Sequence, residues 1–250
     1  MRAGLYEPSK WADVAAGLGL HDVSLSASAQ DFRGPFEPFL SPAKTAAACL
    51  EYTARGVTPH VMLWPRPEAT FSRAMLAWLK DLHERCPELG SCDLDAEEQW
   101  TTHAHRERVG AEAARILRQG WPVGLPLGVN GITIALPKIL DLVRVADEVW
   151  PQAYSANRRN MNTTPGKRQL VVADAWAKEL RPGQRLSMGL AAFDQEGAGG
   201  LPAREALERS AYAAASRVER IRYWSLQDLT AGQDARFVRE LSARCAAPGS

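Results

Sequence analysis

The strongest constraint on the fold is a repeated alternation between short apolar segments and longer helix-like stretches. Each apolar segment is only a few residues long, and the stretch after it carries apolar residues at i, i+3 and i+4 spacing. This alternation is typical of a parallel β/α architecture, in which each strand is followed by a helix. Eight strands are predicted, at residues 2–6, 23–26, 58–64, 91–94, 123–128, 148–153, 185–191 and 221–225.

The stretches between these strands carry signals for where helices begin and end. Ser41 followed by Pro42 is an N-cap with proline at the first helical position, and Gly56 and Gly120 are suited to the left-handed turn after a helix. Helices are predicted at residues 9–18, 41–55, 68–86, 102–119, 136–146, 164–180, 202–219 and 233–245.

Eight β/α units in 250 residues have the usual size of a closed barrel, so we expect an α/β chain folded as a single (β/α)8 TIM barrel. An open doubly wound sheet is the alternative. Against it, the first β-to-α turn, Glu7-Pro8-Ser9-Lys10, lacks a glycine-rich dinucleotide fingerprint. Without repeats or linkers, one domain is expected over residues 1–246, with a loose tail at residues 247–250.

Composition narrows the class of partner. The chain has 30 basic and 29 acidic residues, a net charge of +1 and 46% hydrophobic residues, which disfavours a disordered or nucleic-acid-binding protein. No apolar run approaches the roughly 20 residues that span a bilayer, so no membrane partner is expected. Glu7 and Pro8 come too early for a secretory segment, which predicts synthesis in the cytoplasm without a signal peptide.

The cysteines and histidines predict no metal or other cofactor. The four cysteines, at positions 49, 86, 92 and 245, follow neither a metal-ligand spacing nor a disulfide framework. They are interpreted as unpaired thiols, although a bridge between Cys86 and Cys92 is an alternative. His103-Ala104-His105 has no third ligand nearby and is assigned to the start of a helix.

Three acids follow one another at the end of the fourth expected strand. With a side-chain period of two, Asp93, Asp95 and Glu97 point to one face. Acids so close together in a partly dry site cannot all ionise, so a proton is shared among them. This pattern predicts acid/base catalysis at a strand end, where such barrels hold their active sites, and a solvated acidic loop is the alternative.

Asp93-Leu94-Asp95-Ala96-Glu97 resembles the Asp-x-Asp-x-Glu core of glycoside hydrolase family 18, the chitinases and endo-N-acetylglucosaminidases. Those enzymes are (β/α)8 barrels with this motif on strand four. The chain departs from the family pattern in two places. Gly90 stands where a further aspartate is usual, and Met62-Leu63-Trp64-Pro65 replaces the Ser-x-Gly-Gly of strand three.

Two later strands extend the resemblance. Gln152 and Tyr154 are similar to the Gln-x-Tyr of hevamine-type members, and Trp224 is similar to the tryptophan that floors the sugar subsite. The resemblance implies that Tyr154 hydrogen-bonds the substrate acetamide.

The resemblance also implies roles for the three acids. Glu97 is the general acid and then the base, and Asp95 orients the 2-acetamido group, whose carbonyl oxygen attacks the anomeric carbon. Asp93 holds Asp95 in the required protonation state.

The chain also resembles the lysozymes of glycoside hydrolase family 25, whose strand four carries Asp-x-Glu, matched by Asp95-Ala96-Glu97. In this alignment Tyr6 and Glu7 end strand one, with Glu7 in place of an aspartate. Both families act on β-1,4-linked N-acetylated sugars. The substrate class is therefore the same in either alignment.

Other residues at expected strand ends are candidates for lining a glycan groove: Trp64, Asn130 and Asp194. The eight tryptophans divide by position. Trp64, Trp100 and Trp224 lie at or beyond strand ends, where sugars stack, whereas Trp78 and Trp176 lie within helices and are expected in the core.

The expected function is hydrolysis of β-1,4 bonds in an N-acetylglucosamine-containing polysaccharide, by a monomer. Peptidoglycan is favoured, as for a lysozyme or endolysin released to act on the cell wall. Alternatives are a chitinase or endo-N-acetylglucosaminidase, an inactive glycan-binding barrel, and a barrel enzyme acting on phosphorylated metabolites. The last would need a phosphate cup, for which residues 197–200 are the candidate.

Overall fold

The computed structural model describes residues 3–29, 34–154, 164–191 and 203–224, with residues 237, 240, 241, 243 and 244 near the C-terminus. The chain divides into two compact units, Met1–Glu148 and Val149–Ser250. A single domain over residues 1–246 stays a prediction, and residues 247–250 lie outside the described part.

The first unit is built on four strands that neighbour one another in chain order. These are β1 (Asp22–Ser26), β2 (Thr58–Leu63), β3 (Cys92–Asp95) and β4 (Leu127–Ile132). Each registered pair is parallel, with Ser24 opposite His60 and Asp95 opposite Asn130. The carboxyl ends of the four strands therefore lie along one edge.

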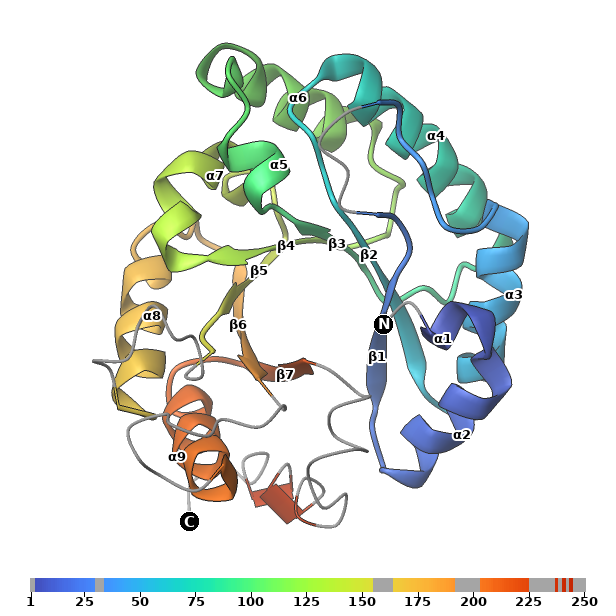
Figure 1. Ribbon diagram of the computed structural model, residues 1–250. Coiled ribbons are helices and arrows are strands. Elements are labelled where there is room, and N and C mark those ends of the chain that lie inside the picture. The colour runs from blue at the N-terminus through green and yellow to red at the C-terminus, as the bar shows by residue number, and fades with distance from the viewer. Residues whose placement is uncertain are drawn as a thin grey trace. The chain divides into compact units, whose positions relative to one another are not determined.

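Helices separate these strands along the chain. They are α1 (Ala3–Tyr6), α2 (Pro8–Gly17), α3 (Pro42–Thr53), α4 (Ala69–Arg85), α5 (Glu98–Thr101), α6 (Arg106–Gly120) and α7 (Leu136–Val143), with a 3-10 turn at Thr133–Ala135. Helices α2, α3, α4 and α6 pack each on the next (Figure 1). The N-cap prediction for α3 is confirmed, since the Ser41 hydroxyl accepts from the Lys44 amide at 3.4 Å.

Aliphatic side chains form the core of the first unit. Leu25, Val61, Leu63, Leu94 and Val129 come from the four strands and are fully buried. Burial of side chains of this size stabilises the fold by about 1.5–3 kcal/mol each. Against this apolar core, the few buried polar residues on the same strands are candidates for a functional site.

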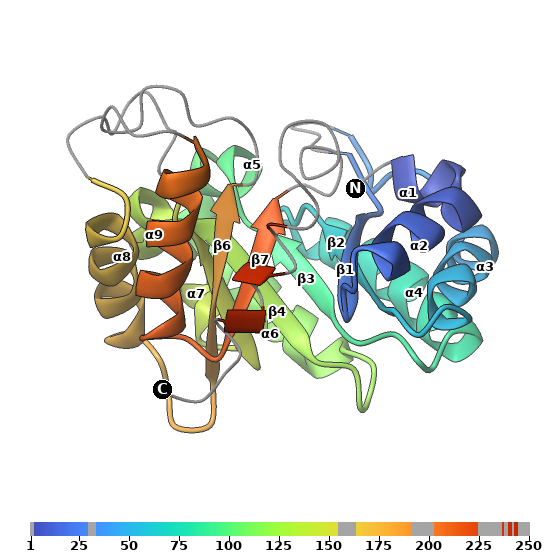
Figure 2. The same ribbon diagram turned by 90° about the horizontal axis from the view of Figure 1, so that it is seen from below.

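The second unit contains β6 (Arg185–Ala191), β7 (Arg220–Trp224) and all of β5 (Glu148–Gln152) except its first residue, again in chain order. Strands β6 and β7 are parallel, and the Ala153 amide after β5 donates to the Gly189 carbonyl of β6 at 2.8 Å. Helices α8 (Lys167–Ala177) and α9 (Ala203–Ala215) pack together beside β6 (Figure 2). Trp176, fully buried, anchors α8 in this core.

Seven of the eight predicted strands are present among the described residues, and the first is wrong. Residues Ala3–Tyr6 form helix α1 instead, a segment without a single β-branched residue. Leu5 is buried there, the Tyr52 hydroxyl donates to the Gly4 carbonyl at 3.3 Å, and Pro8 begins α2 almost at once. The acidic motif therefore lies on the third described strand, and closure into an eight-stranded barrel stays a prediction.

No helix in the described ranges is long and apolar enough to cross a membrane. Cys49, Cys86 and Cys92 are buried as free thiols, so Cys86 and Cys92 do not form the alternative bridge. Cys245 lies outside the described residues.

Candidate active site

Strand β3 places two carboxylates inside the first unit. Asp93 is fully buried and Asp95 is 4% exposed, and they share one face of the strand because they are two positions apart. A buried carboxylate is tolerated only when it is hydrogen-bonded, and the Ser91 hydroxyl donates to Asp93 Oδ1 at 3.1 Å. Cys92 lies between Ser91 and Asp93. Burial and the nearby Asp93 raise the pKa of its thiol, which therefore stays neutral.

A glycine on the neighbouring strand makes room for Asp93. Gly128 of β4 is the registered partner of Asp93. A Cβ atom at Gly128 would lie 1.9 Å from Asp93 Oδ1, which is far shorter than two non-bonded atoms can approach. The Asp93 carboxylate therefore occupies the space that a side chain at position 128 would fill.

Glu97 lies just beyond the strand and differs from the aspartates in being partly exposed. The strand ends at Asp95, and Glu97 is the N-cap residue of α5, where its carbonyl accepts from the Thr101 amide at 2.9 Å. Gln99 of the same short helix donates from Nε2 to the Asp95 carbonyl at 2.9 Å. The turn into α5 therefore places an accessible acid directly after two buried ones.

Two further predicted residues lie at the same edge of the first unit. Asn130 is 2% exposed on β4, opposite Asp95, and its carbonyl accepts from the Ala96 amide at 3.0 Å. Trp64 follows β2, and its amide donates to the Ser28 hydroxyl at 3.1 Å. Among the described residues, no group hydrogen-bonds Asn130 Oδ1 or Trp64 Nε1, and a ligand at this edge could satisfy both buried atoms.

His60 is a residue of this site that sequence reasoning missed. It lies on β2, is 5% exposed, and its Nδ1 is 2.7 Å from the Ser91 hydroxyl. A signal was present, because Ser91 stands two positions before Asp93 and so shares its strand face. Nothing in the sequence indicated that His60 would reach Ser91.

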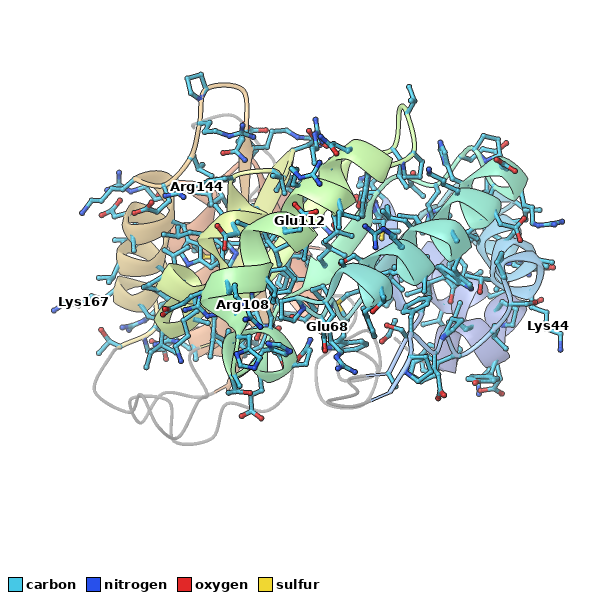
Figure 3. The ribbon with its side chains drawn as sticks, turned by 90° about the horizontal axis from the view of Figure 1, so that it is seen from above. Lys44, Glu68, Arg108, Glu112, Arg144 and Lys167 are labelled. Carbon is cyan, nitrogen blue, oxygen red and sulfur yellow. The ribbon has the colours of Figure 1, made fainter. Side chains whose placement is uncertain are left out.

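A second polar cluster lies where β2 runs into α4. Glu68, labelled in Figure 3, precedes α4 and binds the Arg66 guanidinium, which also donates to the Gly34 carbonyl at 2.8 Å. His103 Nε2 is 3.3 Å from Glu68 Oε1, and His103 Nδ1 accepts from the His105 amide at 3.2 Å. The His103 imidazole therefore contacts Glu68. Among the described residues, no group of three or more histidine, cysteine or acidic side chains could hold a metal ion.

The remaining candidates of the resemblance belong to the second unit. Gln152 is 7% exposed at the end of β5, and Tyr154, two residues later, is partly exposed. The Ala153 carbonyl between them accepts from Gln169 Nε2 at 2.6 Å. Trp224 is the last residue of β7, and Asp194 lies outside the described residues.

The strand-one candidates are not at a strand end. Tyr6 ends helix α1 and is 53% exposed, while Glu7 caps α2 and pairs with Lys10 Nζ at 3.2 Å. Their placement after a first strand is wrong for the reason given above, namely that residues Ala3–Tyr6 are helical.

The tryptophan predictions are partly confirmed. Trp78 and Trp176 are core residues, as expected, and the Trp78 Nε1 donates to the Leu40 carbonyl at 3.1 Å. Trp100, expected to stack on sugar, is fully buried because α5 turns it into the interior. It therefore offers no face to a ligand.

No protein-family model matches the chain, and no curated protein matches it in sequence. Solved structures do. A GH5_18 enzyme (E153A) from Streptomyces cattleya, in complex with Manb1-4GlcNAc, aligns with a TM-score of 0.74 at 14% identity, covering 98% of this chain and 77% of that one.

Two other structures show the breadth of this likeness. The Bacillus cereus spore cortex-lytic enzyme SleL aligns with a TM-score of 0.62 at 14% identity, covering 94% of this chain and 70% of that one. The xylanase-alpha-amylase inhibitor protein XAIP-I, in complex with trehalose, aligns with a TM-score of 0.66 at 13% identity, covering 95% and 93%. The chain therefore has the α/β fold shared by these proteins.

Proposed function

We propose that the chain is a glycoside hydrolase that cleaves β-1,4 bonds in an N-acetylglucosamine-containing glycan. The observation that carries the proposal is the pair of buried carboxylates, Asp93 and Asp95, followed at once by the accessible Glu97. The fold supports it, because GH5_18 enzymes and a spore cortex-lytic enzyme share this fold.

The proposed mechanism gives each acid one role. Glu97 protonates the glycosidic oxygen and then activates water, since it alone of the three is accessible. Asp95 orients the substrate acetamide, whose carbonyl oxygen attacks the anomeric carbon, and Asp93 sets the protonation of Asp95. This substrate-assisted route is the family 18 form of the reaction, and the complete Asp-x-Asp-x-Glu motif supports it over the family 25 form.

Substrate contacts are proposed for several other residues. Tyr154 hydrogen-bonds the acetamide, and Asn130 and Trp64 contribute the polar atoms that lack a protein partner. Gln152 and Trp224, at strand ends of the second unit, are further proposed substrate contacts. Tyr6, Glu7 and Asp194 keep the binding role assigned from sequence as untested proposals.

Peptidoglycan is the proposed polymer, and the bacterial cell wall is the proposed place of action. The likeness to a spore cortex-lytic enzyme supports this choice over chitin. Release of the protein from the cell in which it is made forms part of the same proposal.

The test is hydrolysis of purified peptidoglycan and of chitin oligomers, with products identified by mass spectrometry. We expect new reducing ends from peptidoglycan, and we expect Glu97→Gln to lower kcat by about a hundred- to ten-thousandfold. Glu98→Gln is the matched control, because Glu98 is the next residue, carries the same charge and is exposed. Equal activity of wild type and Glu97→Gln would contradict the mechanism, and products from chitin alone would make the enzyme a chitinase.

A glycan-binding protein without hydrolytic activity is the second candidate. One observation favours it: the inhibitor XAIP-I, solved with trehalose, has the same fold. Tight binding of N-acetylglucosamine oligomers by wild-type protein with no product after prolonged incubation would establish this reading instead.

A further inference from the structure

We infer that His60 and Ser91 form a buried hydrogen-bond relay that positions Asp93 for the reaction, an inference that rests on the proposed function. His60 Nδ1 lies 2.7 Å from Ser91 Oγ, and Ser91 Oγ lies 3.1 Å from Asp93 Oδ1. All three side chains are at most 5% exposed. Neither His60 nor Ser91 belongs to the acidic motif.

The direction of the relay follows from the hydrogens available. Ser91 has one hydroxyl hydrogen, and it is donated to Asp93 Oδ1. The short contact with His60 therefore requires the imidazole to donate from Nδ1. Hydrogen bonds in a chain of this kind polarise one another, which strengthens the last one, to the Asp93 carboxyl group.

Gly90 explains how the histidine comes to be there. A Cβ atom at position 90 would lie 2.6 Å from His60 Cε1 and 2.7 Å from Thr58 Cγ2. The imidazole thus fills the space that a side chain at position 90 would need. In the family 18 pattern an aspartate usually stands at the position of Gly90, just before the strand that carries the acidic motif. In this chain the space beside Gly90 is taken by His60 of the neighbouring strand β2.

The contacts with Ser91 and Gly128 both involve the same oxygen of Asp93, Oδ1. Ser91 binds Oδ1, and the same oxygen overlies the backbone of Gly128, where no side chain competes for the space. The carboxylate is therefore kept in one orientation relative to Asp95 on the same strand face. His60 and Ser91 act through Asp93 and are positioning residues.

The test is Ser91→Ala, measured by kcat and KM on peptidoglycan fragments. Because the hydrogen bond that orients the Asp93 carboxyl group is removed, we expect kcat to fall about ten- to a hundredfold while KM stays within about twofold. Ser91→Thr, which keeps the hydroxyl, is expected to recover most of the rate. Ser72→Ala is the matched control, because Ser72 is also fully buried in the first unit but its hydroxyl has no partner.

Two further variants keep the inference testable if Ser91→Ala folds poorly. His60→Asn places an amide donor near the position of Nδ1 and should retain activity, whereas His60→Leu removes the donor and should not. In an Asp93→Ala background, which leaves no acceptor for the Ser91 hydroxyl, Ser91→Ala should cause no additional loss, because the relay has lost the group through which it acts.

The outcomes separate this inference from the proposed function. Wild-type kcat in Ser91→Ala, together with loss of activity in Glu97→Gln, would overturn the relay and leave the proposed function standing. Equal losses in Ser91→Ala and Ser72→Ala, or losses of Ser91→Ala and Asp93→Ala that add in the double variant, would overturn the relay and leave Ser91 a structural role only. A wild-type protein that hydrolyses no glycan overturns both.

Discussion

The two units bury different kinds of polar side chain. Among its described residues, the first unit buries three acidic side chains, those of Asp93, Asp95 and Glu148. Among the described residues of the second unit, the buried polar side chains are amides and hydroxyls: Gln152, Gln169, Ser187 and Ser210. An acidic group that can ionise costs more to bury than an amide or a hydroxyl, so burial of polar side chains costs more in the first unit.

The hydrogen bonds of these groups show the same difference. In the first unit, His60 and Ser91 lead to a carboxylate on the strand that ends near Glu97. In the second unit, Gln169 binds two backbone groups, the Ala153 carbonyl at 2.6 Å and the Gly166 amide at 2.8 Å. The comparison teaches that a buried hydrogen-bond chain in the first unit ends on the acidic motif, whereas Gln169 in the second unit holds backbone groups in place.

The largest effect should separate Asp95 from Tyr154. In the proposed mechanism Asp95→Asn replaces the carboxyl group that orients the acetamide, and we expect kcat to fall about a hundred- to a thousandfold. Tyr154→Phe removes one hydroxyl and should lower kcat only about tenfold. Steady-state kinetics on the same glycan measures both. A loss in Tyr154→Phe as large as in Asp95→Asn would break the comparison.

A smaller effect should distinguish two glycines. Gly128→Ala pushes Asp93 aside, and a displacement of about 1 Å can lower kcat about a hundredfold. In Gly189→Ala the new Cβ would be 3.5 Å from the Pro151 carbonyl, an ordinary contact, so activity should barely change. Kinetics with urea unfolding of each variant tests this, and full activity in Gly128→Ala would show that Asp93 can move without consequence.

The smallest effects should distinguish two buried amides. Asn130→Leu removes an unpartnered oxygen, so we expect unchanged or higher stability and a KM raised about tenfold. Gln169→Leu leaves two backbone groups unpaired and should lower the free energy of unfolding by about 1–3 kcal/mol without altering KM. Urea denaturation and kinetics on both variants sharpen the comparison. Unchanged KM in Asn130→Leu would remove Asn130 from the proposed substrate contacts.

The spacing of apolar residues predicted most of the strands and helices, because this spacing depends only on residues close together in the sequence. The strands β1, β2, β5, β6 and β7 begin and end within two residues of expectation. The expected strand at residues 123–128 lies four residues late, at Leu127–Ile132, because the segment after Trp121 turns first, with the Leu125 amide donating to the Pro122 carbonyl. The first strand failed because a four-residue apolar segment has no periodicity that distinguishes a strand from a helical turn.

The candidate site was predictable where its residues share one strand. Asp93 and Asp95 follow from a period of two, and Asn130 from its place at the end of the next strand. His60 could not be found in this way, because its contact with Ser91 joins residues 31 apart and depends on the register of β2 with β3. Trp100 was misplaced because it lies within the short helix α5, where its side chain is fully buried.

The packing of His60 against Gly90 has an evolutionary consequence. Positions 60 and 90 share one volume, so neither can be exchanged for a larger or more polar residue unless the other changes with it. A relative with an acid at position 90 must therefore carry smaller side chains at positions 58 and 60, because the new Cβ would meet both Thr58 and His60. Joint changes at positions 58, 60 and 90 among aligned relatives would show where this packing was exchanged for another.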